Sequence, residues 1–123
     1  MTVSAITNSD AVRFAAEWVR AWNSHDLDEI LSHYAVSVTL TSPAAAALLG
    51  DPRGEVKGLS ALRAYFKKGL DAYPNLRFDL VDVMSGVSSV VLYYVNQKGT
   101  KTGEFMELDA DGKVTRVVAN YSA

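Results

Sequence analysis

The C-terminal half of the sequence has the pattern of an antiparallel β-sheet. After Pro74 the helical spacing of apolar residues ends, and four strand-like segments follow at 76–84, 88–96, 100–108 and 113–121. Short turns that contain glycine separate these segments. Alternating apolar residues bounded by such turns are typical of successive antiparallel strands. The chain is therefore restricted to folds built on such a sheet.

The N-terminal half is mostly helical. Apolar residues recur at helical spacing from 10 to 22, after candidate N-caps at residues 8–10. A second, shorter helix is predicted from Asp26 to residue 34, with Asp26 as its cap, and a third helix from 59 to 73. Two helices packed together open the chain.

One strand and a long loop are predicted between the second and third helices. Val36, Val38 and Leu40 alternate with polar residues, which indicates a half-buried strand that ends at Pro43. The loop after it contains an alanine run and tight-turn residues. This order predicts an α+β fold in which a curved antiparallel sheet wraps around three N-terminal-half helices and leaves a cone-shaped interior.

Length and composition indicate one domain and exclude several functions. The chain has 123 residues, 49% of them hydrophobic, so residues 1–123 should form a single domain, with residues 1–8 as a flexible lead. The chain has 12 basic and 14 acidic residues, so we expect no positively charged surface that could bind nucleic acid. The sequence has no membrane-length apolar run, no leader-like start and no cysteine, which together predict a cytoplasmic protein.

No motif indicates a metal, a cofactor or a nucleophilic triad. His25 and His33 lack partners at ligand spacing and are interpreted as solvated or capping residues. The Asp109–Gly112 segment lacks the remaining ligands of a calcium loop and is interpreted as a hairpin turn. Gly-x-Ser-x-Gly is absent. We therefore predict no metal and no cofactor.

The strand at 90–95 is apolar on both of its alternation sets, so both of its faces should be covered. The helices can cover one face. A second copy of the chain is the economical cover for the other, which predicts a homodimer through the outer sheet face.

Aromatic residues gather on the apolar sides of the three predicted helices. Facing them, the sheet is expected to contribute Met84, Tyr93, Tyr94 and Met106. Buried Trp and Tyr need hydrogen-bond partners, so this set forms either a plain core or a polar-lined cavity, and its size favours the cavity. The helical set is Phe14, Trp18, Trp22, Tyr34, Tyr65, Phe66 and Tyr73.

Glu104 is the acidic residue most suggestive of chemistry. Alternation places it on the same strand face as Met106 and Leu108. A carboxyl group on an apolar face has a raised pKa unless it is paired, which makes it a candidate acid or base. The alternative is that Glu104 lies at a frayed strand start near Gly103 and reaches water.

Three segments also carry a family resemblance: residues 14–43, 58–70 and 107–121, with the Ala-Trp-Asn-x-x-Asp-Leu-Asp turn at 21–28 and the Asp-Gly-Lys hairpin as the more specific parts. They resemble the nuclear-transport-factor-2-like superfamily and, within it, the SnoaL-like group. The resemblance implies a cystatin-like α+β roll, commonly dimeric through the outer sheet face, with a ligand site inside the cone. Members include ketosteroid isomerases, cyclases, dehydratases and proteins without known catalysis, so the fold alone does not give the function.

The ketosteroid isomerase pattern has three functional positions, and the resemblance places the same type of side chain at only one of them in this sequence. The resemblance places Trp18 where the isomerase has an oxyanion-hole tyrosine, Ser42 where it has its base aspartate, and Glu104 where it has a carboxylic acid. A serine without a neighbouring base cannot take a proton from carbon, so that isomerase reaction is disfavoured. Glu104 is left as the predicted single catalytic acid or base.

Two functional hypotheses follow. The first is a pocket protein that binds a small, mostly apolar molecule and acts as an isomerase, cyclase or dehydratase; the second is a non-catalytic dimeric binding or adaptor module. Arg53, in the predicted loop, is a further candidate for the mouth of the cone. Besides Glu104, the predicted pocket residues are Trp18, Trp22, Tyr34, Ser42, Tyr65, Phe66 and Met106.

Overall fold

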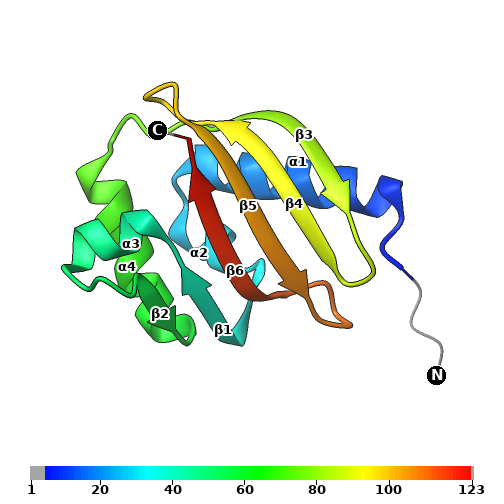
Figure 1. The fold of residues 1–123 in the computed structure, drawn as a ribbon, viewed down its shortest axis with the longest axis horizontal. Helices are drawn as coiled ribbons and strands as arrows, with labels where there is room; N and C mark the ends of the chain where they lie inside the picture. Colours follow the sequence, from blue (N-terminus) through cyan, green and yellow to red (C-terminus); the bar gives the residue numbers. More distant parts are fainter. Residues whose placement is uncertain (1–4, 123) are drawn as a thin grey trace.

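The computed structural model describes residues 5–122, and its central feature is a six-stranded sheet that curves around the helices (Figure 1). The predicted α+β fold with a curved sheet is confirmed. The helices are α1 (Asn8–Ser24), α2 (Leu27–Leu31), α3 (Pro43–Leu49) and α4 (Leu59–Ala72). The strands are β1 (Tyr34–Thr41), β2 (Glu55–Lys57), β3 (Asp79–Ser85), β4 (Ser89–Val95), β5 (Lys101–Leu108) and β6 (Val114–Tyr121).

The sheet has the strand order β2-β1-β6-β5-β4-β3. Strands β3 to β6 pair antiparallel in sequence order, as predicted. Strand β1 pairs antiparallel with β2 but runs parallel to β6, so the sheet is mixed. This parallel pair joins the first long strand to the last strand of the chain. The elements α3, β2, α4 and β3 to β5 all lie between these two strands in the sequence. The parallel pair thereby ties the two halves of the fold together.

Helix α1 begins earlier than the sequence indicated. Its N-cap is Thr7, whose side chain accepts a hydrogen bond from the Asp10 backbone N–H, so none of the candidate caps at residues 8–10 takes that role. The predicted lead over residues 1–8 thus overlaps the helix, and Ile6 donates a backbone hydrogen bond to Val87. Residues 1–4 of that lead lie outside the described residues. The cap predicted for α2, Asp26, is confirmed.

The segment after β1 is a helix and a strand, where the sequence predicted a long loop. Ser42 caps α3 by accepting a hydrogen bond from the Ala44 N–H at 3.1 Å, and Pro43 occupies a first-turn position where it costs no hydrogen bond. Gly50, with φ of 67°, ends the helix. The cap and the proline therefore turn the alanine run into helix.

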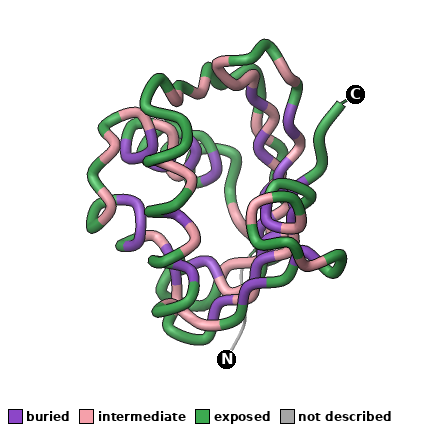
Figure 2. The backbone as a smooth tube through the Cα atoms, turned by 90° about the vertical axis from the view of Figure 1, so that its left-hand side faces the viewer, coloured by how far each residue is buried: buried purple, intermediate pink, exposed green. Residues whose placement is uncertain are grey.

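Burial along β1 departs from simple alternation. Val36 was expected inside, but 79% of its surface is exposed, whereas Tyr34, Val38 and Leu40 are buried. The pairing with β6 shifts register between Tyr34 and Thr39, which takes Val36 out of the inward-facing set. Buried, intermediate and exposed stretches are interspersed along the backbone (Figure 2).

Two sheet residues expected to face the helices point elsewhere. Met84 is 55% exposed, and Tyr93 lies on the opposite strand face from the buried Tyr94. Met106 is fully buried, as its alternation with Phe105 requires. The bulge in the pairing of β3 with β4, between Leu80 and Asp82, changes the alternation of β3 in the stretch before Met84.

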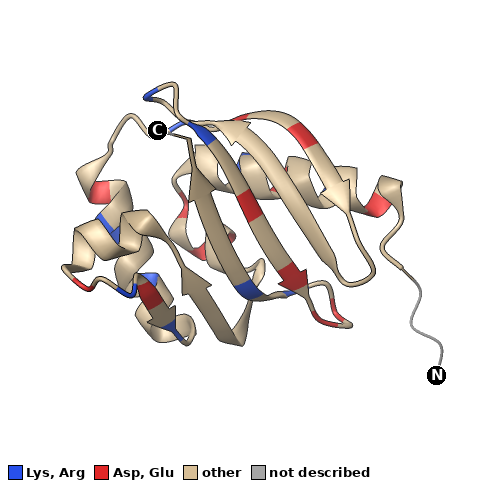
Figure 3. Ribbon diagram, in the orientation of Figure 1, with Lys and Arg blue, Asp and Glu red and all other residues tan. Residues whose placement is uncertain are grey.

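Acidic and basic residues are interspersed over the ribbon, with neither sign gathered on one layer (Figure 3). Within residues 5–122, no helix has both the length and the apolar character that crossing a membrane requires.

Gly54→Ala tests the close approach of the turn before β2 to the end of β1. Gly54 has φ of +58°, and an added Cβ would overlap the carbonyl oxygen of Ser42. We expect the free energy of unfolding to fall by about 2 kcal/mol or more, because both the left-handed backbone and this contact oppose a side chain. Urea denaturation measures the change.

Gly69→Ala is the matched control. Gly69 lies inside α4, and an added Cβ there would meet nothing within 4 Å. Alanine should raise the free energy of unfolding by about 0.5–1 kcal/mol through helix propensity. If Gly54→Ala raised the free energy of unfolding, as Gly69→Ala should, this result would contradict the packing around Gly54.

Candidate functional site

A cavity of about 510 Å³ lies between the inner face of the sheet and helices α1, α3 and α4. This volume is in the range of small-molecule sites. Among the described lining residues, Glu104 has the only carboxyl group and Lys98 the only positive charge. The lining also contains eight aromatic residues, Trp18, Trp22, Tyr65, Phe66, Tyr73, Phe78, Tyr94 and Tyr121.

The structure brings most of the predicted site residues together around this cavity. Glu104 lines it, together with Trp18, Trp22, Ser42, Tyr65 and Phe66. Tyr34 and Met106 are buried but do not line it.

Sequence reasoning missed Tyr121, Phe78 and the β4–β5 hairpin at residues 96–100 as lining residues. The apolar alternation of Val117, Ala119 and Tyr121 was the one local signal that could have found Tyr121.

Glu104 lies inside the sheet. It sits on β5 between Leu92 of β4 and Ala119 of β6, and only 6% of its surface is exposed. This position is paired on both sides, so the alternative of a frayed, solvated strand start does not hold. Its Oε2 accepts a hydrogen bond from the Tyr94 hydroxyl at 2.6 Å.

Burial controls the protonation of this pair. Desolvation raises the pKa of Glu104 to about 7, and the hydrogen bond from Tyr94 only partly offsets it. Burial, together with the nearby Glu104 carboxyl, raises the pKa of Tyr94 well above its ordinary value. At neutral pH the carboxyl group therefore exchanges between acid and base forms, while the phenol keeps its proton.

The indole of Trp18 is already used inside the protein. Its Nε1–H donates to the Tyr34 hydroxyl at 2.9 Å, and its ring stacks on Phe78 with 5.7 Å between centroids. Trp18 thus contributes an aromatic face to the cavity, and its donor hydrogen is satisfied by protein. Trp22 Nε1 is buried and has no hydrogen-bond partner in the part of the chain that the structure describes.

Ser42 combines a structural role with a place in the cavity wall. Its Oγ accepts the Ala44 N–H of α3 and lies 3.2 Å from the Tyr121 hydroxyl. Burial raises the pKa of Tyr121, so this partner stays protonated and does not act as a base. Ser42 is therefore a hydrogen-bonding group and not an activated nucleophile.

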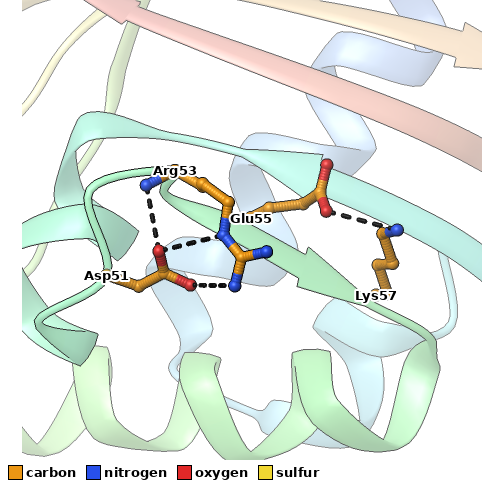
Figure 4. A network of polar contacts seen from close by, with 4 residues as sticks. All are labelled: Asp51, Arg53, Glu55 and Lys57. Carbon is orange, nitrogen blue, oxygen red and sulfur yellow. Dashed lines mark hydrogen bonds and ion pairs between the residues drawn. The ribbon is translucent and has the colours of Figure 1, made fainter.

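The β4–β5 hairpin meets the end of α4 at the side of the cavity. Lys98 Nζ lies 4.4 Å from the centre of the Tyr73 ring and 3.2 Å from its hydroxyl oxygen. Arg53, the residue that the sequence suggested for the mouth of the cone, is not in the lining. It pairs with Asp51 on the surface, beside the Glu55–Lys57 pair (Figure 4).

The two histidines take structural positions. His25 is the C-cap of α1, with φ of 60°, and its Nε2 lies 2.8 Å from the Leu76 carbonyl oxygen. His33 packs edge-on against Phe14, and burial lowers its pKa. The structure, over residues 5–122, holds no group of three or more His, Cys, Asp or Glu residues that could bind a metal.

Comparison with known proteins identifies the family. The profile described as a SnoaL-like domain matches residues 15–118. The chain belongs to the SnoaL-like domain family. No curated protein matches this SnoaL-like domain closely enough to suggest an activity.

Solved structures share its fold. A SnoaL-like protein of unknown function from Burkholderia thailandensis is 36% identical, with 98% of this chain and 100% of that chain covered and a TM-score of 0.93. A candidate isomerase of the SnoaL-like family from Agrobacterium tumefaciens is 14% identical over 94% and 99% of the two chains, with a TM-score of 0.74. TerC, co-crystallised with polyporic acid, is 15% identical over 91% of each chain, with a TM-score of 0.74.

The raised pKa of Glu104 makes folding stability depend on pH. The group's ordinary pKa is 4.5, and in the folded chain it is about 7. Between these values the folded chain keeps a proton that the unfolded chain releases, so raising the pH lowers the free energy of unfolding, by about 3 kcal/mol for this one group. Glu104→Gln preserves the shape but does not titrate.

We therefore expect the wild type to lose more stability than Glu104→Gln between about pH 5 and about pH 8, as urea denaturation measures it. Glu107→Gln, on the outer face of the same strand and paired with Arg116, should follow the wild type. Parallel pH profiles for wild type and Glu104→Gln would show that the carboxyl group is not held in a desolvated site.

Proposed function

We propose that this protein acts in the cytoplasm, that it binds a small, mostly apolar, aromatic molecule in its cavity, and that Glu104 acts on the molecule as a single general acid or base. The observation that carries the proposal is a buried carboxyl group with a pKa of about 7 in the wall of an aromatic cavity of about 510 Å³. A group that titrates near neutral pH is suited to both giving and taking a proton.

The Glu104–Tyr94 pair defines the chemistry that the site supports. In its acid form Glu104 donates a proton or a hydrogen bond to a ligand oxygen, and in its base form it accepts a proton from an acidic carbon or hydroxyl. Tyr94 donates to the carboxylate and stabilises it after the transfer. One group that takes and returns a proton suffices for an isomerisation, a cyclisation or a dehydration.

The ketosteroid isomerase arrangement is not supported, because its base position is held by Ser42, whose bonds are to Ala44 and Tyr121. TerC, which shares this fold, was co-crystallised with polyporic acid, and this supports a small-molecule ligand for the proposed function.

A plug variant tests binding in the cavity. Gly69 lines the cavity and has free space around its Cβ position, so Gly69→Trp should fill the cavity without backbone strain. The probe is acetylnaphthalene, an apolar aromatic ketone. At about 100 times its dissociation constant it should stabilise the wild type and Gly69→Ala by about 2.7 kcal/mol, and leave Gly69→Trp unchanged.

The same samples in deuterated buffer report the catalytic part of the proposal. Wild type should accelerate deuterium exchange at the carbon beside the ketone, followed by NMR, and Glu104→Gln should not. Equal stabilisation of Gly69→Trp would place the ligand outside the cavity, and equal exchange by Glu104→Gln would remove Glu104 from the chemistry.

A second candidate function, a dimeric binding or adaptor module without catalysis, is favoured by one feature of the outer sheet face. The pairing registers place Met84, Val91, Phe105 and Val118 in one row across four adjacent strands. These side chains lie on the face away from the helices, and Met84 is more than half exposed. A continuous apolar row of this kind is suited to a second copy of the chain.

Val91→Glu tests this homodimer. A charge in the middle of the row should shift the protein to monomer in sedimentation velocity at micromolar concentration, while Ser37→Glu, on the exposed part of β1, should leave the assembly unchanged. A wild type that is already monomeric would remove the proposal.

A further inference from the structure

The cavity wall contains further hydroxyl groups besides the Glu104–Tyr94 pair. Ser42 from the end of β1 and Tyr121 from β6 are in contact, with 3.2 Å between their oxygens. Tyr65 of α4 lines the same cavity, and the Ser42 hydroxyl is among the groups that influence its pKa. All three residues line the cavity, and they come from three separate parts of the chain.

The Ser42–Tyr121 pair has one donor hydrogen more than it can use. Each of the two hydroxyls has one hydrogen, and one bond joins them, so one hydrogen lacks an acceptor within the pair. The Ser42 hydroxyl already accepts a hydrogen bond from the Ala44 N–H, so one acceptor position and its own O–H remain for the neighbouring phenols. Among residues 5–122 the Tyr121 hydroxyl has Ser42 as its one hydrogen-bond partner.

The phenols also keep their hydrogens. Burial is the main cause that raises the pKa of both Tyr65 and Tyr121, so neither ionises at neutral pH. The cavity wall therefore presents a spare O–H donor beside Ser42, and such a donor is suited to an acceptor atom on the occupant.

We propose that Ser42, Tyr65 and Tyr121 form a second binding site in the cavity, which takes a carbonyl or carboxylate oxygen of an aromatic ligand. The inference rests on the proposed function, since it supplies the chemical class of the molecule that Glu104 acts on. It makes the ligand a molecule with an acceptor oxygen on an apolar body, and it selects against hydrocarbons of the same shape.

The test compares two ligands that differ in one group. Acetylnaphthalene carries the carbonyl oxygen, and ethylnaphthalene, substituted at the same position, has nearly the same shape without it. Calorimetry measures both affinities in the wild type and in the double variant Tyr65→Phe/Tyr121→Phe. We expect the wild type to bind the ketone about tenfold more tightly, the double variant to lose most of this preference, and the affinity for ethylnaphthalene to change little.

Controls separate this inference from the proposed function. Tyr93→Phe, on the outer sheet face, should keep the full preference, and Tyr121→Phe alone should reduce it in part, which provides a reading if the double variant does not fold. A preference that persists without these hydroxyls overturns the inference and leaves the cavity proposal standing. Failure of the wild type to bind either naphthalene overturns the cavity proposal itself.

Discussion

The desolvation of one carboxyl group on a central strand governs what this cavity can do. Glu104 is held between β4 and β6, and its bond from Tyr94 compensates only part of the cost of burial. Removing that carboxyl from water is unfavourable for the fold, and the same cost brings its pKa close to neutrality. The property that weakens the structure is thus the property that suits Glu104 to the proposed proton transfer.

The rest of the cavity is arranged around this group by the curvature of the sheet. The parallel contact between β1 and β6 brings the end of the first strand next to the end of the last, which places Ser42 beside Tyr121 although 79 residues separate them. Helix α4 supplies the facing wall, including Tyr65. The Ser42–Tyr121 pair and Tyr65 therefore meet at one part of a wall that is rich in aromatic residues, and the proposed ligand places its acceptor oxygen there.

Local patterns in the sequence predicted the parts of the fold that depend on local chemistry. Alternation placed Glu104 on an inward strand face, and Asp26 marked the start of α2. Val36 was misplaced because a register shift against β6, a tertiary feature, removes it from the inner face. Helix α3 had its cap and proline in the sequence, but the following turn residues suggested a loop. Alternation puts Tyr121 on the strand face of Val117 and Ala119, but it does not show that the curved sheet brings this end of β6 to the cavity.

The capping of α3 by Ser42 has a consequence for how this protein's chemistry can change. Aspartate caps helices about as well as serine, so the helix start would tolerate either residue. Yet the two differ completely in the cavity, where one contributes a neutral hydroxyl and the other a second carboxylate facing the space beside Glu104. Position 42 is thus a point at which a single substitution changes the acid–base content of the site while the surrounding backbone stays in place.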